Sequence, residues 1–308
     1  MARRTGVTVL KIAITALAFA WLFVVVDRRA VASSLARVTL VAFAGAVALT
    51  LLGVFVGTLR WRALLAAYGA PNRPSIARLF RLYLVGTFYN TWLPGAVAGD
   101  VVRGVATNES FGADGTVSAV AVVLIERVLG LVGLLAITAT VVLLHPLHQD
   151  SRVLYASLAG IALAFSLIAL VSAGYRIGPR IGGTLGQRIA SLPRIQSAAP
   201  FALAILLSLF TQILVPLSAH LFMNVIDPHV ALTDTLAVFP IVTAAAYFPF
   251  SVNGAGVRET AAAYLFEAVG VARGDAVAVS LLVWCAQAAV GALGGLLQLA
   301  PAKEKSAP

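Results

Sequence analysis

The chain has 308 residues, of which 60% are hydrophobic and 11% are charged, and it carries a formal net charge of +10. Ordinary soluble domains are about 45–50% apolar and about 25% charged, so this composition excludes a water-soluble globular protein and predicts an all-α polytopic membrane protein. Its basic residues lie in short connectors between apolar segments, so we expect them to contact anionic lipid headgroups and not nucleic acid.

Six apolar segments are long enough to cross a bilayer as helices, which takes about 20 residues each. They comprise residues 7–26, 38–59, 116–144, 153–173, 201–225 and 276–299. The first segment resembles a signal peptide, because arginines precede it. We interpret it as an uncleaved first helix, since further spans follow it.

Two more apolar segments are broken and are not expected to cross. Residues 82–93 supply only about 18 Å of helix before a proline and glycines interrupt them. Residues 236–250 lead into a glycine-rich turn and a short return over residues 261–270. We expect both to be re-entrant, with eight spans if both crossed instead. The expected helix breaks and points of close backbone approach are Pro94, Gly95, Gly99, Pro249, Gly254 and Gly256.

The basic connectors predict the orientation, because short cytoplasmic loops carry an excess of lysine and arginine. Basic residues cluster within residues 60–81, 176–194 and 303–305. Six crossings with two re-entrant segments place all three clusters and both termini in the cytoplasm. We therefore expect a protein of the cytoplasmic membrane with a short cytoplasmic tail at residues 301–308. The arginines expected to contact anionic lipid there are Arg60, Arg62, Arg78 and Arg81.

The two broken segments also match each other. Three residue pairs share an offset of 155 residues, namely Pro94 with Pro249, Gly99 with Gly254 and Arg103 with Arg258. We infer a single membrane domain over residues 1–300, whose halves at residues 76–145 and 232–300 form an inverted repeat. In transporters, such repeats place the substrate near the bilayer midplane between broken helices.

A few ionisable residues fall inside the apolar segments. Glu126 and Arg127 lie about 15 Å into residues 116–144, where each charge costs roughly 2.5–3.5 kcal/mol and needs a partner, a cavity or a ligand. Adjacent helical residues point about 100° apart, so the two side chains do not simply neutralise each other. The residues expected along a path for a lipid headgroup are Asp100, Arg103, Glu126, Arg127, Asn253, Arg258 and Glu259. The alternative is that these residues only form ion pairs that hold the helices together.

Several motifs occur together in a recognisable order. Residues 88–95 and 99–103 precede Glu126-Arg127, residues 253–259 follow, and Arg60-Trp61-Arg62 comes before them all. The set resembles the transmembrane (flippase) region of the lysylphosphatidylglycerol synthase family over roughly residues 51–299. One departure is Ala98-Gly99, where the family usually has two glycines.

The resemblance implies a membrane domain that moves or accommodates a lipid with a modified headgroup, such as aminoacylated phosphatidylglycerol, or another anionic lipid. It implies no aminoacyl transfer, which belongs to a separate soluble domain in the full-length synthases. The chain carries no phosphate-binding loop, nucleophile elbow or zinc-protease motif, so we expect no enzyme activity, cofactor or metal. Two alternatives are a membrane partner of an enzyme acting on polyprenyl-phosphate substrates and a non-transporting scaffold.

Overall fold

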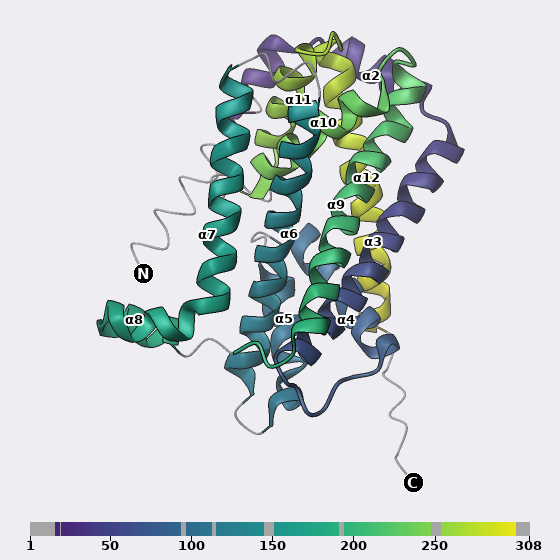
Figure 1. The fold of residues 1–308 in the computed structure, drawn as a ribbon. Helices are drawn as coiled ribbons and strands as arrows, with labels where there is room; N and C mark the ends of the chain where they lie inside the picture. The colour runs from purple at the N-terminus through teal and green to yellow at the C-terminus, as the bar shows by residue number, and fades with distance from the viewer. Residues whose placement is uncertain are drawn as a thin grey trace.

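The computed structural model describes residues 16–18, 20–93, 97–112, 115–144, 151–190, 194–247 and 254–299, and the regular structure within them is helical (Figure 1). The elements that position the site are α2 (Arg28–Arg37), α3 (Leu40–Ala67), α4 (Ile76–Trp92), α5 (Ala98–Val105), η1 (Asn108–Phe111), α6 (Thr116–Leu144), α7 (Ser151–Ile181), α8 (Gly183–Ala190), α9 (Ala198–Ile226), α10 (Leu232–Tyr247), α11 (Val257–Glu267) and α12 (Arg273–Leu299). The chain is an all-helical, multi-pass membrane protein, as predicted.

Four helices, α3, α6, α9 and α12, are apolar and 27 to 29 residues long. Each is about 40 Å long at 1.5 Å per residue, which exceeds the roughly 30 Å of the bilayer core. They confirm four predicted spans, at residues 38–59, 116–144, 201–225 and 276–299. The predicted span at residues 153–173 lies within the 31-residue helix α7. The first, at residues 7–26, begins outside the described residues.

The two broken segments form helical hairpins at opposite ends of the molecule. Helices α4 and α5 have 17 and 8 residues and pack against each other at the lower end in Figure 1. Helices α10 and α11, with 16 and 11 residues, form the second hairpin at the upper end. Each hairpin returns to the end from which it entered, so both segments are re-entrant, as predicted. Pro94, Gly95, Pro249 and Asn253 lie outside the described residues.

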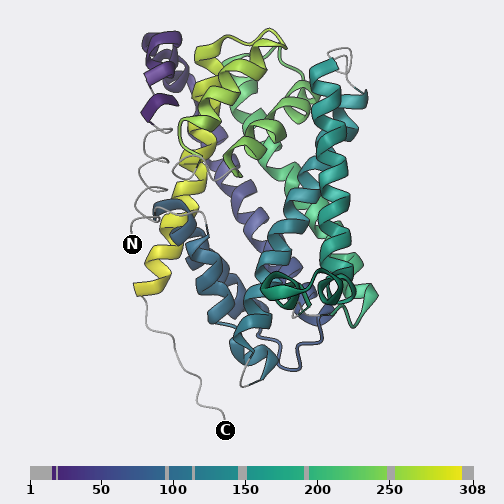
Figure 2. The ribbon, with the colours of Figure 1, turned by 90° about the vertical axis from the view of Figure 1, so that its left-hand side faces the viewer.

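Each hairpin is followed by one long helix that runs to the other end of the molecule. The hairpin α4–α5 precedes α6, and the hairpin α10–α11 precedes α12, with the two units in opposite orientations (Figures 1 and 2). These units fall within the predicted repeat halves, residues 76–145 and 232–300. Aligning the two helices by their first residues gives a different pairing from the offset of 155 residues. The third residue is Asp100 in α5 and Glu259 in α11, so the helix starts align these acids and not Arg103 with Arg258.

Glycines permit the close helix contacts that hold the lower hairpin in place. A Cβ atom at Gly99 of α5 would lie 1.9 Å from the carbonyl oxygen of Gly86 in α4, so only glycine fits there. Helix α12 crosses α4 in the same way, because a Cβ atom at Gly294 would lie 1.9 Å from the carbonyl oxygen of Leu84. Helix α4 is therefore fixed by backbone contact on two sides.

In the upper hairpin, glycine serves a different purpose. Gly254 and Gly256 have φ angles of 76° and 79°, in the left-handed region that favours glycine, and they form the turn into α11. The Glu259 carboxylate accepts a hydrogen bond from the Gly256 backbone N–H at 2.8 Å and so fixes the start of this helix. The predicted close approach of backbone thus occurs at Gly99, whereas Gly254 and Gly256 supply unusual backbone conformation.

Candidate functional site

The centre of the candidate site is the carboxylate of Glu126, on α6, which is 1% exposed. Arg60 of α3 donates to its Oε1 at 2.7 Å, and Arg103 of α5 donates to its Oε2 at 3.1 Å. The hydroxyl of Tyr83, on α4, donates to Oε1 at 2.9 Å. Four helices therefore converge on one carboxylate, and two cations compensate its charge where water cannot.

A second carboxylate, Asp100, extends this arrangement. Arg103 donates to its Oδ1 at 2.8 Å while also binding Glu126, so one guanidinium joins the two acids. Arg127 pairs with the other oxygen of Asp100 and is 29% exposed, the most accessible of the group. As expected, Arg127 and Glu126 have different partners. We call Arg60, Asp100, Arg103, Glu126 and Arg127 the charge network; its three guanidiniums and two carboxylates give a net charge of +1.

The position of Arg103 depends on aromatic neighbours as well as on ion pairs. Its guanidinium carbon lies 4.1 Å from the ring centroid of Tyr83 and 5.0 Å from that of Trp61. Such cation–π contacts are worth about 2 kcal/mol or more when desolvated. Trp61 is fully buried in the hydrophobic core of the lower end, so the network rests on a packed surface.

Replacing Tyr83 with phenylalanine should lower the free energy of unfolding by roughly 1.5–3 kcal/mol, the value of a hydrogen bond to a charged group. The ring under Arg103 is kept, and only the hydroxyl that binds Glu126 and Arg60 is lost. Thermal unfolding in detergent measures the effect. Tyr264→Phe is the matched control, because that tyrosine is 62% exposed and its loss should change little. Equal unfolding of both variants and the wild type would contradict the assigned role.

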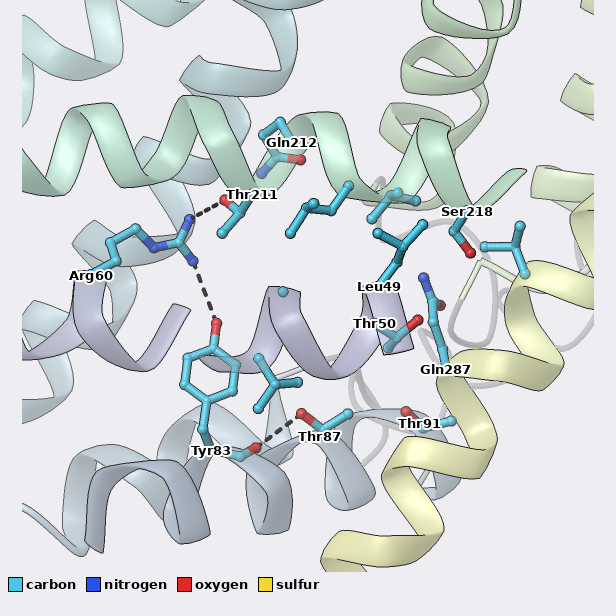
Figure 3. A pocket seen from close by; sticks show the side chains of 15 residues that line it. Leu49, Thr50, Arg60, Tyr83, Thr87, Thr91, Thr211, Gln212, Ser218 and Gln287 are labelled. Atoms are coloured by element: carbon cyan, nitrogen blue, oxygen red, sulfur yellow. Dashed lines mark hydrogen bonds between the residues drawn. The ribbon is translucent and has the colours of Figure 1, made fainter. Parts of the chain in front are cut away.

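Two neighbouring cavities, which share part of their lining, adjoin the charge network. The smaller, of about 190 Å³, lies within the network and is also lined by Asn90. The larger, of about 290 Å³, lies between α3, α4, α9 and α12 (Figure 3). Residues that line both cavities are Arg60, Tyr83, Thr87 and Gln212. The network is therefore bordered on one side by a larger cavity whose lining is partly polar and partly apolar.

Sequence analysis predicted one path containing seven residues, and the structure divides them. Asp100, Arg103, Glu126 and Arg127 belong to the charge network. Arg258 and Glu259 pair with each other in the other hairpin, and Arg258 also donates to Ser280 of α12 at 3.1 Å. Glu259 therefore balances an arginine, which is the pairing role that the sequence left open for these residues. The structure does not join these two clusters among the described residues.

The surface role predicted for Arg60 was wrong. This residue is 7% exposed, because α3 continues beyond the apolar segment to Ala67 and carries Arg60 inside the helix bundle. Arg62 and Arg78 are exposed, so lipid contact remains a prediction for them. Arg81 is half-buried and donates to the carbonyl oxygen of Leu297, in α12, at 2.9 Å.

Sequence reasoning missed the residues that line the larger cavity. Eight hydroxyl or amide side chains do so, namely Thr50, Tyr83, Thr87, Thr91, Thr211, Gln212, Ser218 and Gln287. The available signal was the run of polar residues in the apolar segment at residues 201–225, which includes three of them. A single threonine or serine in a membrane helix is common because its hydroxyl can bond to its own helix. Only the tertiary structure shows that the eight share one cavity.

One family comparison covers nearly the whole chain. The family model described as the lysylphosphatidylglycerol synthase TM region matches residues 8–295. This range contains every residue of the charge network and both hairpins. No curated relative matches the chain.

Proposed function

Because the chain belongs to the lysylphosphatidylglycerol synthase transmembrane-region family, we propose that it translocates phospholipids across the cytoplasmic membrane. The family indicates a function connected with membrane lipids, and the proposal specifies transport. One observation carries it: a buried network with a net charge of +1 borders a cavity among membrane-spanning helices, and polar side chains form part of the lining of that cavity. A phosphate group carries the complementary charge, and arginine is well suited to bind it.

In the proposed mechanism, the headgroup occupies the polar cavities while the acyl tails stay in the surrounding lipid. Arg127 is the natural first contact for the phosphate, because it is the most exposed cation of the network and lines the smaller cavity. The cations at Arg60 and Arg103 lie deeper and are each held by a carboxylate. We place the α4–α5 end in the cytoplasm, since Arg62, Arg73 and Arg78 lie exposed near that end.

The proposal is tested by leaflet exchange in vesicles that contain the purified protein. Phosphatidylglycerol with a fluorescent acyl chain reports transfer, because a membrane-impermeant reductant quenches only the outer leaflet. Wild-type protein should accelerate exchange over empty vesicles. The variant Arg127→Gln should lose most of this acceleration, because it reduces the net charge of the network from +1 to zero while Asp100 keeps Arg103 as a partner.

The matched control is Arg29→Gln, which removes the same charge from an exposed residue of α2 and should leave exchange unchanged. Equal exchange in wild-type and empty vesicles would contradict translocation. That result would favour the alternative in which the chain is a membrane partner of an enzyme acting on polyprenyl-phosphate substrates.

A further inference from the structure

The larger cavity has a chemical character of its own, distinct from the charge network beside it. Its polar lining consists of eight hydroxyl or amide side chains from four helices, with Arg60 at one end (Figure 3). The rest of the lining is apolar and comes from Leu49, Val54, Leu214, Val215 and Val283. No acidic side chain lines the cavity among the described residues. Its volume of about 290 Å³ is at the lower limit of small-molecule sites, which run from about 300 to 1,000 Å³. This volume can hold a lipid headgroup but has no room for the acyl chains.

The lining presents hydrogen-bond acceptors to the cavity. Thr50 and Thr87 donate their hydroxyl protons to carbonyl oxygens of their own helices, at 2.8 and 2.9 Å. Their oxygens therefore keep lone pairs that can accept a bond from a ligand. Thr211 also donates to its own helix, at 2.8 Å, and accepts from Arg60. The amides of Gln212 and Gln287 add both donors and acceptors.

Two buried polar atoms of this cavity have no hydrogen-bond partner in the described part of the chain. One is the hydroxyl of Ser218, a residue that is 2% exposed, and the other is Nε of Arg60, which is 7% exposed. Leaving such a group unsatisfied is costly, so each one calls for an explanation. A ligand inside the cavity that supplies both acceptors and donors would give both groups a partner once their side chains turn toward it.

The same lining disfavours a cation. An ammonium group buried at membrane depth needs a carboxylate partner, and neither Glu126 nor Asp100 is free to provide one, because guanidiniums already hold both. Arg60 at the end of the cavity would also repel it. A neutral polyol carries no charge that needs a buried partner. Each of its hydroxyls can both donate to and accept from the side chains that line the cavity.

We infer that this cavity selects lipids whose phosphate carries an uncharged, hydroxyl-rich group, such as glycerol or a sugar, over lipids whose headgroup ends in an ammonium. The inference rests on the proposed function and names its substrate class. The phosphate would face the charge network, and the hydroxyls would face Ser218, Gln212 and Gln287. It departs from the aminoacylated headgroup that the family resemblance suggests.

The test compares four acyl-labelled lipids in the same vesicles. Phosphatidylglycerol and phosphatidylinositol carry hydroxyls, phosphatidylmethanol is anionic without hydroxyls, and lysylphosphatidylglycerol is cationic. We expect phosphatidylglycerol, phosphatidylinositol or both to exchange at least fivefold faster than phosphatidylmethanol. Phosphatidylmethanol has no headgroup hydroxyl, so it forms about one net hydrogen bond fewer with the cavity. Lysylphosphatidylglycerol should be slowest. The ratio between the two hydroxyl lipids distinguishes a glycerol from a sugar-like headgroup.

Two variants connect the selectivity to the cavity. Ser218→Ala should reduce the advantage of the hydroxyl lipids over phosphatidylmethanol about fivefold, while Ser166→Ala, at an exposed serine of α7, should leave it unchanged. Gln287→Glu should raise the exchange of lysylphosphatidylglycerol relative to phosphatidylglycerol, because it adds the missing carboxylate. Size-exclusion chromatography checks that each variant is folded.

The outcomes separate the two proposals. If lysylphosphatidylglycerol or phosphatidylmethanol exchanges as fast as the hydroxyl lipids, translocation stands and the headgroup inference is overturned. Selectivity that persists unchanged in Ser218→Ala and Gln287→Glu would also overturn the role of this cavity. Exchange of no lipid above empty vesicles would overturn translocation itself, and the headgroup inference with it.

Discussion

Replacing Glu126 with glutamine should lower the free energy of unfolding by roughly 3–5 kcal/mol, the cost of removing one partner from a buried ion pair. Arg60 then has no carboxylate partner among the described residues and is only 7% exposed, while Arg103 keeps Asp100. The network's net charge rises from +1 to +2 inside the bundle. Thermal unfolding in detergent should show a clear fall in the melting temperature.

A second substitution distinguishes charge imbalance from a local packing defect. In the double variant Arg60→Gln with Glu126→Gln, both charges are gone, so much of the lost stability should return. Glu267→Gln is the control, since its pair with Arg273 is exposed on both sides and contributes little. A melting temperature for Glu126→Gln equal to that of the wild type would show that the pair does not hold these helices together.

Gly99→Ala should be at least as damaging, although it adds only one methyl group. The new Cβ atom would lie 1.9 Å from the carbonyl oxygen of Gly86, and this oxygen cannot move unless α4 moves with it. Overpacking costs roughly 1–3 kcal/mol even where side chains can adjust, and here the obstacle is backbone. Because α5 must shift, Asp100 and Arg103 leave their partners. Leaflet exchange and thermal stability should therefore fall together.

Gly53→Ala is the matched control for the stability part of this prediction only, because Gly53 lines the larger cavity. A Cβ atom at Gly53 of α3 would meet only the Leu214 side chain, at the ordinary contact distance of 3.8 Å. Alanine is favoured over glycine inside a helix by up to about 1 kcal/mol, so this variant should be as stable as the wild type or more so. Normal exchange by Gly99→Ala would mean that the close contact between α4 and α5 is not needed to place the network.

The membrane class and the order of the elements follow from the sequence alone. Apolar runs of more than 20 residues have few stable alternatives to a membrane helix, so the spans at residues 38–59 and 116–144 could be predicted from composition and length. Residues 82–93 are too short to cross, which already indicated a re-entrant segment. The sequence also marked Glu126 and Arg127, because a charge in an apolar run is costly wherever the helix packs.

What the sequence could not determine is which residues meet. Arg60 stands 66 positions before Glu126, at the end of an apolar run, where an arginine ordinarily faces lipid headgroups. Only the packing of α3 against α6 places it beside that carboxylate. Arg258 was predicted to share one path with Arg103, but it pairs with its own acid, Glu259, in the other hairpin.

The larger cavity also could not be predicted from the sequence. Hydropathy is a property of one segment, and it determined that this chain spans a membrane and where most of its helices lie. A site between helices depends on side-chain contacts among segments distant in sequence, such as Thr50 of α3 and Gln287 of α12. Each such residue alone is a minor polar exception within an apolar helix. Only the tertiary structure shows that these polar side chains face one another, because buried polar groups are stable where the packing of helices brings their partners together.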